Sequence, residues 1–232
     1  KYPKVLITKI AKEPHIGIVN GLYATSAGTG GLTLVEVMKT PTDRKLGLEL
    51  TGNQGDVMKE SMSCAKTLAW NLLPKEIKKE IKDDWEETGN WGLHIHCPEA
   101  GMPKDGPSAG ITITTAILSR LCGIPVKNTI AMTGEVDLHG KVHAIGGLNS
   151  KLEGARRAGV KLVLIPEDNR EDYDKIVNED ALETPVSSPR TGNNIKHSRF
   201  GEHFKVIPVK TIFEVIKYAL IENEIDFINF FK

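Results

Sequence analysis

The chain has 232 residues, of which 40% are hydrophobic and 26% charged, so it is long enough to bury one substantial core. Its 30 basic and 30 acidic residues cancel, which gives no electrostatic basis for binding nucleic acid or a membrane surface. No apolar run in the sequence approaches the roughly 20 residues that a transmembrane helix needs.

The N-terminal part of the chain is rich in short β-type segments separated by turn residues. Four strands are predicted, over residues 5–10, 17–25, 32–39 and 46–50, and their spacing is typical of an antiparallel meander. The glycine cluster at residues 28–31 lacks the Gly-Lys-Ser/Thr ending of a phosphate-binding loop. It therefore favours a hairpin turn between two of these strands.

Two helices are predicted next. Residues 56–73 have the period of an amphipathic helix, and residues 75–87 that of a charged helix packing one edge. The expected apolar stripe of the first helix consists of Val57, Ser61, Cys64, Ala65, Leu68 and Leu72. This helix also contains Ser63 and Lys66, a Ser-x-x-Lys match to the penicillin-recognising enzymes. The Ser-Asp-Asn and Lys-Thr-Gly partners of that motif are not found, so the pair is a rival nucleophile site with little support.

A strand predicted over residues 93–98 carries two histidines on one face. His94 and His96 alternate with Ile95, and side chains alternate between the two faces of a strand. A metal site would need a third ligand, and the spacing offers none. Structural or site-lining roles are therefore favoured for this pair.

The loop after this strand has the pattern of an activated serine. Gly106 and Pro107 break the strand, and residues 111–122 predict a helix with Gly123 as its stop signal. We expect Ser108 in the first turn of this helix, among unsatisfied backbone N–H groups and at the positive end of the helix dipole. Such a position stabilises the oxyanion that forms when a carbonyl is attacked. The alternative is a serine that only caps the helix.

A serine hydroxyl needs a base that takes its proton, and the candidate is Lys151. Ser150 and Glu153 fit a Ser-x-x-Glu capping box, which predicts a helix over residues 150–158 with Lys151 in its first turn. To act as a base at neutral pH, the amine needs its pKa lowered from about 10.4 by roughly 2–3 units. The helix dipole acts in that direction, and the uncharged neighbours are compatible with a dry setting. The alternative is a solvated surface lysine.

The rest of the chain alternates predicted strands and helices. Strands are predicted over residues 129–136, 141–145, 160–165 and 204–209, and helices over residues 170–178 and from a Thr211–Glu214 capping box to about residue 224. The polar residues 183–203 predict an excursion loop, and Phe227, Phe230 and Phe231 are expected to dock on a neighbour or face the core. The order of the elements indicates one α/β (α+β-like) domain with a strand-rich N-terminal half.

The serine and the lysine belong to a larger set of motifs. Residues 103–110 read Pro-Lys-Asp-Gly-Pro-Ser-Ala-Gly, and Lys151 follows Ser108 by 43 residues (151 − 108), shortly after the run Ile-Gly-Gly at residues 145–147. Further matching motifs occupy residues 17–22, 34–36, 50–61, 94–99, 132–136 and 164–169. Over residues 5–180 and 204–220, this order of motifs resembles the proteolytic domain of Lon proteases.

The resemblance implies a serine endopeptidase with a Ser–Lys dyad, in which Ser108 is the nucleophile and Lys151 the general base. It also implies that Thr133 supports the lysine amine by a hydrogen bond, that Asp105 and Gly106 shape the site, and that the backbone N–H of Ser108 donates to the oxyanion. Such a dyad needs no cofactor and no metal. Gln54 departs from the family pattern, which usually has an apolar residue there, and so does the length of the 183–203 loop.

The resemblance further implies that residues 1–232 are the proteolytic domain of a longer, ATP-dependent chain that works as a homo-hexameric ring on unfolded or damaged proteins. The sequence has no Gly-Lys-Ser/Thr loop, so we expect the ATPase domain, with its ATP and magnesium, and the N-terminal substrate-binding domain to lie outside it. An alternative is a catalytically silent assembly module. Three widely spaced cysteines favour reduced thiols inside a cell. The resemblance implies an intracellular location, in the cytoplasm or the mitochondrial matrix.

Overall fold

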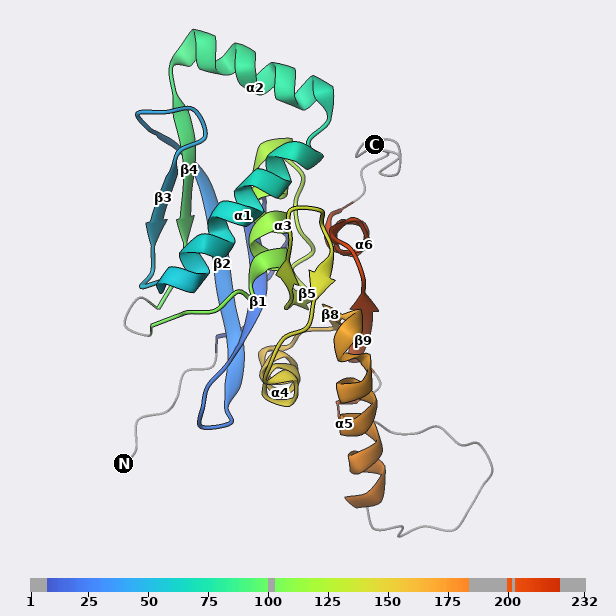
Figure 1. The fold of residues 1–232 in the computed structure, drawn as a ribbon. Coiled ribbons are helices and arrows are strands. Elements are labelled where there is room, and N and C mark those ends of the chain that lie inside the picture. The colour runs from blue at the N-terminus through green and yellow to red at the C-terminus, as the bar shows by residue number, and fades with distance from the viewer. Residues whose placement is uncertain (1–7, 100–102, 184–199, 202, 222–232) are drawn as a thin grey trace.

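The computed structural model describes residues 8–99, 103–183, 200–201 and 203–221, and a seven-stranded sheet forms its centre (Figure 1). The strands of this sheet are β1 (Ile18–Ala24), β2 (Gly30–Pro41), β3 (Leu48–Thr51), β4 (Trp91–His96), β5 (Ile130–Met132), β8 (Leu162–Pro166) and β9 (Lys205–Val209). Their order in the sheet is β3-β4-β2-β1-β5-β8-β9. A separate two-stranded hairpin consists of β6 (Glu135–Val136) and β7 (Val142–His143).

The sheet is antiparallel near its N-terminal strands and parallel elsewhere. β1 and β2 form the predicted hairpin, with Ala24 opposite Gly30 at the glycine-rich turn. β4 also pairs antiparallel with β2, and β3 pairs parallel with β4. On the other side of the sheet, β5 pairs parallel with β1, β8 with β5, and β9 with β8. The predicted four-strand meander is therefore wrong beyond the first hairpin, because the chain returns through two helices before it adds β4 between β2 and β3.

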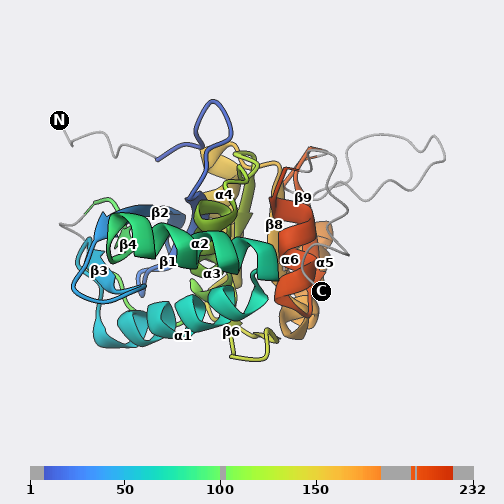
Figure 2. The ribbon, with the colours of Figure 1, turned by 90° about the horizontal axis from the view of Figure 1, so that it is seen from above.

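Helices cover both faces of the sheet (Figure 1). They are α1 (Asp56–Leu72), α2 (Lys75–Thr88), α3 (Gly110–Cys122), α4 (Leu148–Ala158), α5 (Arg170–Glu183) and α6 (Ile212–Ala219), with a short 3₁₀ helix, η1, at Glu167–Asn169. Seen from above, α3 lies between α1 and the sheet, and α4 lies on the opposite side of the sheet (Figure 2). The layers confirm the predicted α/β single-domain class.

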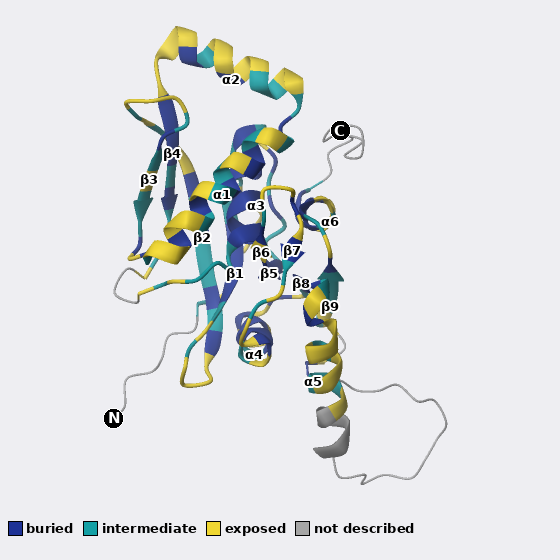
Figure 3. Ribbon diagram, in the orientation of Figure 1, coloured by how far each residue is buried: buried dark blue, intermediate teal, exposed yellow. Residues whose placement is uncertain are grey.

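Alternation along the strands produces two apolar cores. Ile130 and Met132 of β5 pack into the larger core with α1, α3 and α6, whereas Ala131 between them packs into the smaller core with α4. Leu164 and Val163 of β8 divide between the two cores in the same way. The residues of both cores are buried from solvent, and the buried segments run through the centre of the molecule in Figure 3.

The central helix α3 is buried along almost its whole length, although several of its residues carry hydroxyl groups. Two of these hydroxyls donate to backbone carbonyls of the preceding turn, Thr114 to Gly110 at 2.9 Å and Thr115 to Ile111 at 2.8 Å. The other two donate to carbonyls outside the helix, Thr112 to Met132 at 3.3 Å and Ser119 to Ile124 at 2.5 Å, so every buried hydroxyl of α3 has a partner. This pairing lets a threonine-rich segment lie between a sheet and a second helix.

Helix α1 has the predicted length, but its buried stripe is shifted. The buried residues are Met58, Met62, Ala65, Leu68 and Ala69. Val57, which the sequence pattern placed on the stripe, is 46% exposed. The pattern failed at the start of the helix because the buried side of α1, which includes Met58 and Met62, faces α3, and methionine fills irregular space well.

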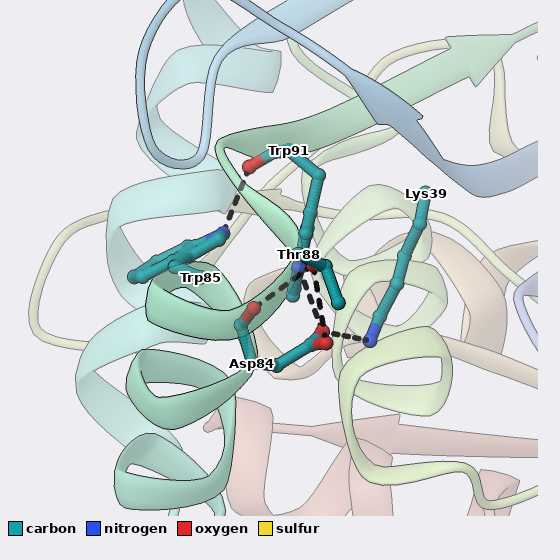
Figure 4. Close-up of polar contacts among 5 residues, drawn as sticks. All are labelled: Lys39, Asp84, Trp85, Thr88 and Trp91. Carbon is teal, nitrogen blue, oxygen red and sulfur yellow. Dashed lines mark hydrogen bonds and ion pairs between the residues drawn. The ribbon is translucent and has the colours of Figure 1, made fainter.

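Helix α2 crosses one end of the molecule and is fastened there by a small polar and aromatic cluster (Figure 4). The indole N–H of Trp85 donates to the backbone carbonyl of Trp91 at 3.1 Å, and that of Trp91 donates to Asp84 at 2.8 Å. The ammonium of Lys39 lies 3.7 Å from the Asp84 carboxylate and 4.1 Å from the centre of the Trp91 ring. These contacts hold a strongly charged helix against β4 by one edge, as predicted.

Three other element predictions need correction. Residues 8–10 form no strand, and residues 5–7 of that prediction lie outside the described residues. The segment predicted as one strand over residues 129–136 splits, since β5 joins the main sheet and β6 pairs with β7. The last helix ends at Ala219 instead of about residue 224, with Leu220 in an extended conformation. Its predicted N-cap is confirmed, because the Thr211 hydroxyl accepts from the N–H of Glu214.

The 183–203 loop falls mostly outside the described residues, and the aromatic tail does so entirely. Within the described part of the chain, no helix combines the length and the apolar character needed to cross a membrane.

Candidate active site

The serine loop ends in a tight turn that delivers the chain into α3. Gly106 has a φ of +104°, a conformation that L-residues rarely adopt and glycine adopts freely. The N–H of Gly110 donates to the carbonyl of Pro107, and the first α-type hydrogen bond runs from Ile113 to Ala109. Ser108 therefore lies two residues before the helix, and not in its first turn as predicted.

The same loop is fastened to the start of α1 by Asp105. Gly55, the N-cap residue of α1, offers no side-chain cap, and the Asp105 carboxylate takes that role by accepting from the N–H of Met58 at 3.0 Å. Backbone hydrogen bonds to this carboxylate, that of Met58 first, lower its pKa. A Cβ at Gly55 would lie 2.4 Å from the Asp105 carboxyl carbon, so the close approach requires glycine. Asp105 is thus a cap supplied from a distant segment.

The neighbouring Gln54, which departs from the family pattern, has a structural place. Its side chain is 7% exposed, and its amide donates to the carbonyl of Thr51. A backbone bridge joins Gln54 to Lys104, and the N–H of Lys104 donates to the carbonyl of Asn53 at 3.0 Å. The serine loop therefore pairs with the segment that precedes α1. Gln54 fits between the two without disturbing the turn at Gly106.

Lys151 lies on α4, close to the beginning of the helix. The helix begins at Leu148 after Gly147, whose left-handed φ of 69° sets the entry of the chain. The predicted Ser150 capping box is wrong, because Ser150 is inside the helix and its hydroxyl donates to the carbonyl of Gly28 at 3.0 Å. Lys151 remains near the N-terminus, as its N–H makes the first intrahelical bond, to Gly147.

The amine of Lys151 is enclosed by protein. The residue is 4% exposed, and this burial lowers the pKa of the amine from its ordinary value to about 8. Its Nζ donates a hydrogen bond to the hydroxyl of Thr133 at 3.0 Å. The sequence prediction of a dry lysine with a depressed pKa agrees with this geometry, and desolvation is its cause.

Thr133 links the lysine to the serine. Its side chain is fully buried, and its hydroxyl donates to the backbone carbonyl of Ser108 at 3.2 Å while it accepts from Lys151. The N–H of Gly134 donates to the same Ser108 carbonyl at 2.8 Å. The position of the serine backbone and that of the amine are therefore fixed by one hydroxyl group. Among the described residues, no direct hydrogen bond joins the side chains of Ser108 and Lys151.

Asn169 is a positioning residue to which the sequence analysis gave no role. Its side chain, 2% exposed, makes two hydrogen bonds with the backbone of Ile145: it accepts from the N–H at 2.9 Å and donates to the carbonyl at 3.0 Å. This amide holds the Ile-Gly-Gly segment that leads into α4 and Lys151. A polar residue three positions after an apolar strand was the available signal, but its partner lies 24 residues earlier and no spacing rule identifies it.

A cavity of about 840 Å³ brings the candidate residues together. Ser108, Lys151, Asp105 and Gly106 all line it, and Thr133 lies buried behind them. Its further walls come from the β1–β2 hairpin and from the turn before α4: Leu22, Tyr23, Ala24, Leu32, Thr33, Leu34, Gly146 and Gly147. Four of the five residues predicted for the site thus line one cavity. The fifth, Thr133, is hydrogen-bonded to two of them, Ser108 and Lys151.

The rival sites lack such a setting. Ser63 is exposed on α1, and neither it nor Lys66 lines the cavity. The rings of His94 and His96 point to one face, as predicted, and both contact the Thr51 hydroxyl, at 2.8 and 2.7 Å. Within the described ranges, no three metal-binding side chains group into a site that could hold an ion.

The buried lysine should lower the stability of the fold. Since its folded-state pKa is about 8 and its unfolded-state pKa about 10.5, the unfolded chain holds the proton more tightly. The penalty is full below pH 8 and is relieved as pH rises toward 10.5. We expect Lys151→Met to raise the free energy of unfolding at pH 7 by on the order of 3 kcal/mol. Urea unfolding measures this gain, and it should shrink at pH above about 10; an equal gain at both pH values would contradict the assignment.

Asn169→Asp tests the anchor of the lysine segment. A carboxylate cannot donate to the carbonyl of Ile145, so a buried acceptor loses its partner, and we expect a loss of about 2 kcal/mol in unfolding free energy. Asn90→Asp is the matched control, because Asn90 is exposed and its amide donates to a backbone carbonyl of Asp43. That control should stay within about 0.5 kcal/mol of the parent chain. Equal effects of the two substitutions would show that Asn169 is no anchor.

Comparison with known proteins identifies relatives over most of the chain. Residues 2–188 match the family described as the Lon protease (S16) C-terminal proteolytic domain. A Lon protease homolog of Acanthamoeba polyphaga mimivirus is 45% identical over 179 residues, which cover 75% of this chain and 17% of the relative. The Lon protease of Fusobacterium nucleatum is 50% identical over 164 residues, 71% of this chain and 20% of the relative.

A longer match joins this chain to the Lon protease of Brucella abortus, at 39% identity over 216 residues, 93% of this chain and 23% of the relative. The chain therefore spans about a fifth of the length of the curated relatives it matches. The matched part includes the serine loop and the helix that carries Lys151.

Proposed function

Because this chain belongs to the family of Lon protease (S16) C-terminal proteolytic domains and is a Lon-type serine peptidase, we propose that Ser108 and Lys151 are its catalytic pair. One observation carries the proposal: a lysine that is 4% exposed, with its pKa lowered to about 8, lines the same cavity as a serine. Burial of an amine lowers the stability of the fold, and residues with strongly perturbed pKa values in a cavity are typical of active sites.

The proposed reaction begins with neutral Lys151. Its amine donates one hydrogen to Thr133, so its lone pair is available for the proton of the Ser108 hydroxyl. The serine oxygen attacks the peptide carbonyl and forms an acyl-enzyme, and the protonated lysine returns the proton to the leaving amine. Water then repeats the sequence and releases the acid. Thr133 keeps the amine oriented in both protonation states because its hydroxyl donates elsewhere, to the Ser108 carbonyl.

The backbone N–H of Ser108 is the proposed oxyanion donor. In the described part of the chain, this N–H makes no backbone hydrogen bond, whereas those of Gly110 and Ile111 are both used. Asp105 and Gly106 have supporting roles in the proposal. Asp105 fixes the loop to α1, and Gly106 supplies the left-handed residue that the turn requires. A donor preset in this way stabilises charge without rearrangement.

For the whole protein, we propose an ATP-dependent enzyme that degrades unfolded or damaged proteins in an intracellular compartment. The relatives are about five times as long as the matched segment, which leaves room for an ATPase domain and an N-terminal substrate-binding domain in the same chain. A homo-hexameric ring, with ATP and magnesium bound outside this domain, completes the proposal. The balanced charge of the domain supports a partner that is protein and not nucleic acid.

A peptidyl boronate or a fluorophosphonate probe separates this proposal from the alternatives. We expect mass spectrometry to find the label on Ser108 and on no other serine. A catalytically silent assembly module would form rings without any label. A penicillin-recognising hydrolase would instead be acylated at Ser63 by a β-lactam. Either of those outcomes, without label on Ser108, would refute the assigned pair.

A further inference from the structure

Three segments of the chain meet at the start of the serine loop. Besides the loop itself, they are the turn between β3 and α1, at residues 52–55, and the segment that leaves β4, at residues 97–99. The last two lie against each other, because a Cβ at Gly52 would be only 2.0 Å from the carbonyl oxygen of Cys97. The N–H of Cys97 also donates to the carbonyl of Thr51 at 3.1 Å. A residue of the serine loop that bonds to both segments would therefore fix the loop to the edge of the sheet.

Lys104 is the residue of the serine loop that makes these bonds. Its backbone N–H donates to the carbonyl of Asn53 at 3.0 Å, and its own carbonyl accepts from the N–H of Gly55 at 2.7 Å. Its ammonium donates to the carbonyl of Glu99 at 2.8 Å and to that of Gly52 at 3.4 Å. The main chain of Lys104 thus holds the turn before α1, and its side chain joins that turn to the segment that leaves β4.

Both segments have an unusual backbone conformation where Lys104 contacts them. Glu99 has a φ of 65° and Asn53 a φ of 59°, two of the three left-handed non-glycine residues in the part of the chain that the structure describes. A left-handed conformation is unfavourable for glutamate and persists only where surrounding contacts hold it. The charge-assisted hydrogen bond from the Lys104 ammonium to the Glu99 carbonyl is such a contact. Backbone held in this way is concentrated at functional sites.

The bonds of Lys104 act close to the proposed nucleophile. Lys104 lines the cavity together with Ser108, which follows it by four residues (108 − 104). The next residue, Asp105, fixes the loop to the N-terminus of α1 through the N–H of Met58. Two consecutive residues therefore anchor the loop to different elements immediately before the turn at Gly106. Since glycine restricts the backbone least, the place of the serine hydroxyl depends on these anchors.

We propose that Lys104 is a positioning residue for the reaction, whose ammonium holds the serine loop in the geometry that presents Ser108 for attack. This inference rests on the proposed function, since it concerns the same nucleophile. An ammonium suits the role because its three donors, on a long stem, can serve two carbonyls of separate segments at once. Lys104 acts through the loop and takes no proton in the reaction. Misplacement of a reacting group by about 1 Å lowers a rate by up to roughly a hundredfold.

Lys104→Met tests the proposal, because methionine keeps an unbranched apolar stem and removes all three donors. With a fluorogenic peptide, we expect kcat to fall by about tenfold or more and KM to stay within about twofold. The affinity for a peptidyl boronate, which mimics the tetrahedral intermediate, should fall in parallel with kcat/KM. Lys104→Arg keeps a charged donor and should recover part of the lost kcat. A parental kcat in Lys104→Met, a loss confined to KM, or an arginine variant no better than the methionine variant would overturn the proposal.

Lys127→Met is the matched control for a purely structural effect. The ammonium of Lys127 also donates to a backbone carbonyl, that of Tyr218 at 3.0 Å, and the residue is partly buried like Lys104. Lys127 does not line the cavity. We expect urea unfolding to show similar losses of stability in the two variants, and kcat to fall only in Lys104→Met. A fall in kcat that follows the loss of stability in both variants would refute a positioning role.

The rate at which Ser108 is labelled separates this inference from the proposed function. In the parent chain, a fluorophosphonate should react with Ser108, and in Lys104→Met the same serine should react about tenfold more slowly or less. A parent chain that carries no label on Ser108 would refute the proposed nucleophile. Equal labelling rates in a labelled parent chain and in Lys104→Met would refute the role of Lys104 and leave the nucleophile in place.

Discussion

Ser108→Ala should reduce peptide cleavage by at least about a thousandfold, since removal of a nucleophile that acts together with its base costs the whole covalent route. The change deletes one oxygen at a half-buried position and leaves the backbone turn intact. The measurement is kcat/KM with a fluorogenic peptide, together with a thermal unfolding curve to show that the fold is unchanged.

Ser63→Ala is the matched control for this prediction. Ser63 also has a lysine as its candidate base, Lys66 three residues later, but it is exposed on α1 and outside the cavity. We expect the control to keep the activity of the parent chain. If the control loses activity and Ser108→Ala retains it, the nucleophile belongs to the Ser-x-x-Lys pair on α1.

Lys151→Met should abolish cleavage to a similar extent while it stabilises the fold. Methionine fills the same space without an amine, so the base is lost and the burial penalty is relieved together. Activity and stability should therefore change in opposite directions, which a merely destabilising substitution cannot produce. Lys66→Met is the control, because burial also lowers the pKa of Lys66, although that residue lies away from the cavity.

The pH profile of the parent enzyme gives an independent measure of the same amine. The base must be neutral, so kcat/KM should rise with pH through about 8 and level off above it. The sign follows from the lowered pKa, because below 8 the amine holds a proton and cannot accept the one from serine. A profile that is flat between pH 7 and 9, or that falls across this range, would be inconsistent with Lys151 as the base.

Much of the fold could be predicted from local patterns. The helix at α1, the hairpin at the glycine-rich turn and the N-cap at Thr211 depend on neighbouring residues, so their signals lie within a short window. The parallel pairing of β3 with β4 joins segments separated by two helices, and no short-range pattern fixes such a pairing. The predicted meander failed for that reason.

The candidate site shows the same division. Ser108 and Lys151 could be proposed from their motifs, but the exact helix starts could not be predicted, because an unrelated contact decides each of them. Gly147 opens α4 ahead of the expected Ser150 cap, and the Ser150 hydroxyl bonds to Gly28 across the fold. Asn169 could not be given a role at all, since its value lies in the distant Ile145 backbone to which it bonds.

A crystal structure of the chain with a peptidyl boronate tests the central claim most directly, because boron bonded to the nucleophile marks the reacting atom. We predict a bond from boron to Oγ of Ser108, with Nζ of Lys151 within about 3.2 Å of that oxygen and still bonded to Thr133. A boronate attached to another residue, or an Nζ turned away from the adduct and beyond hydrogen-bonding reach, would contradict the account.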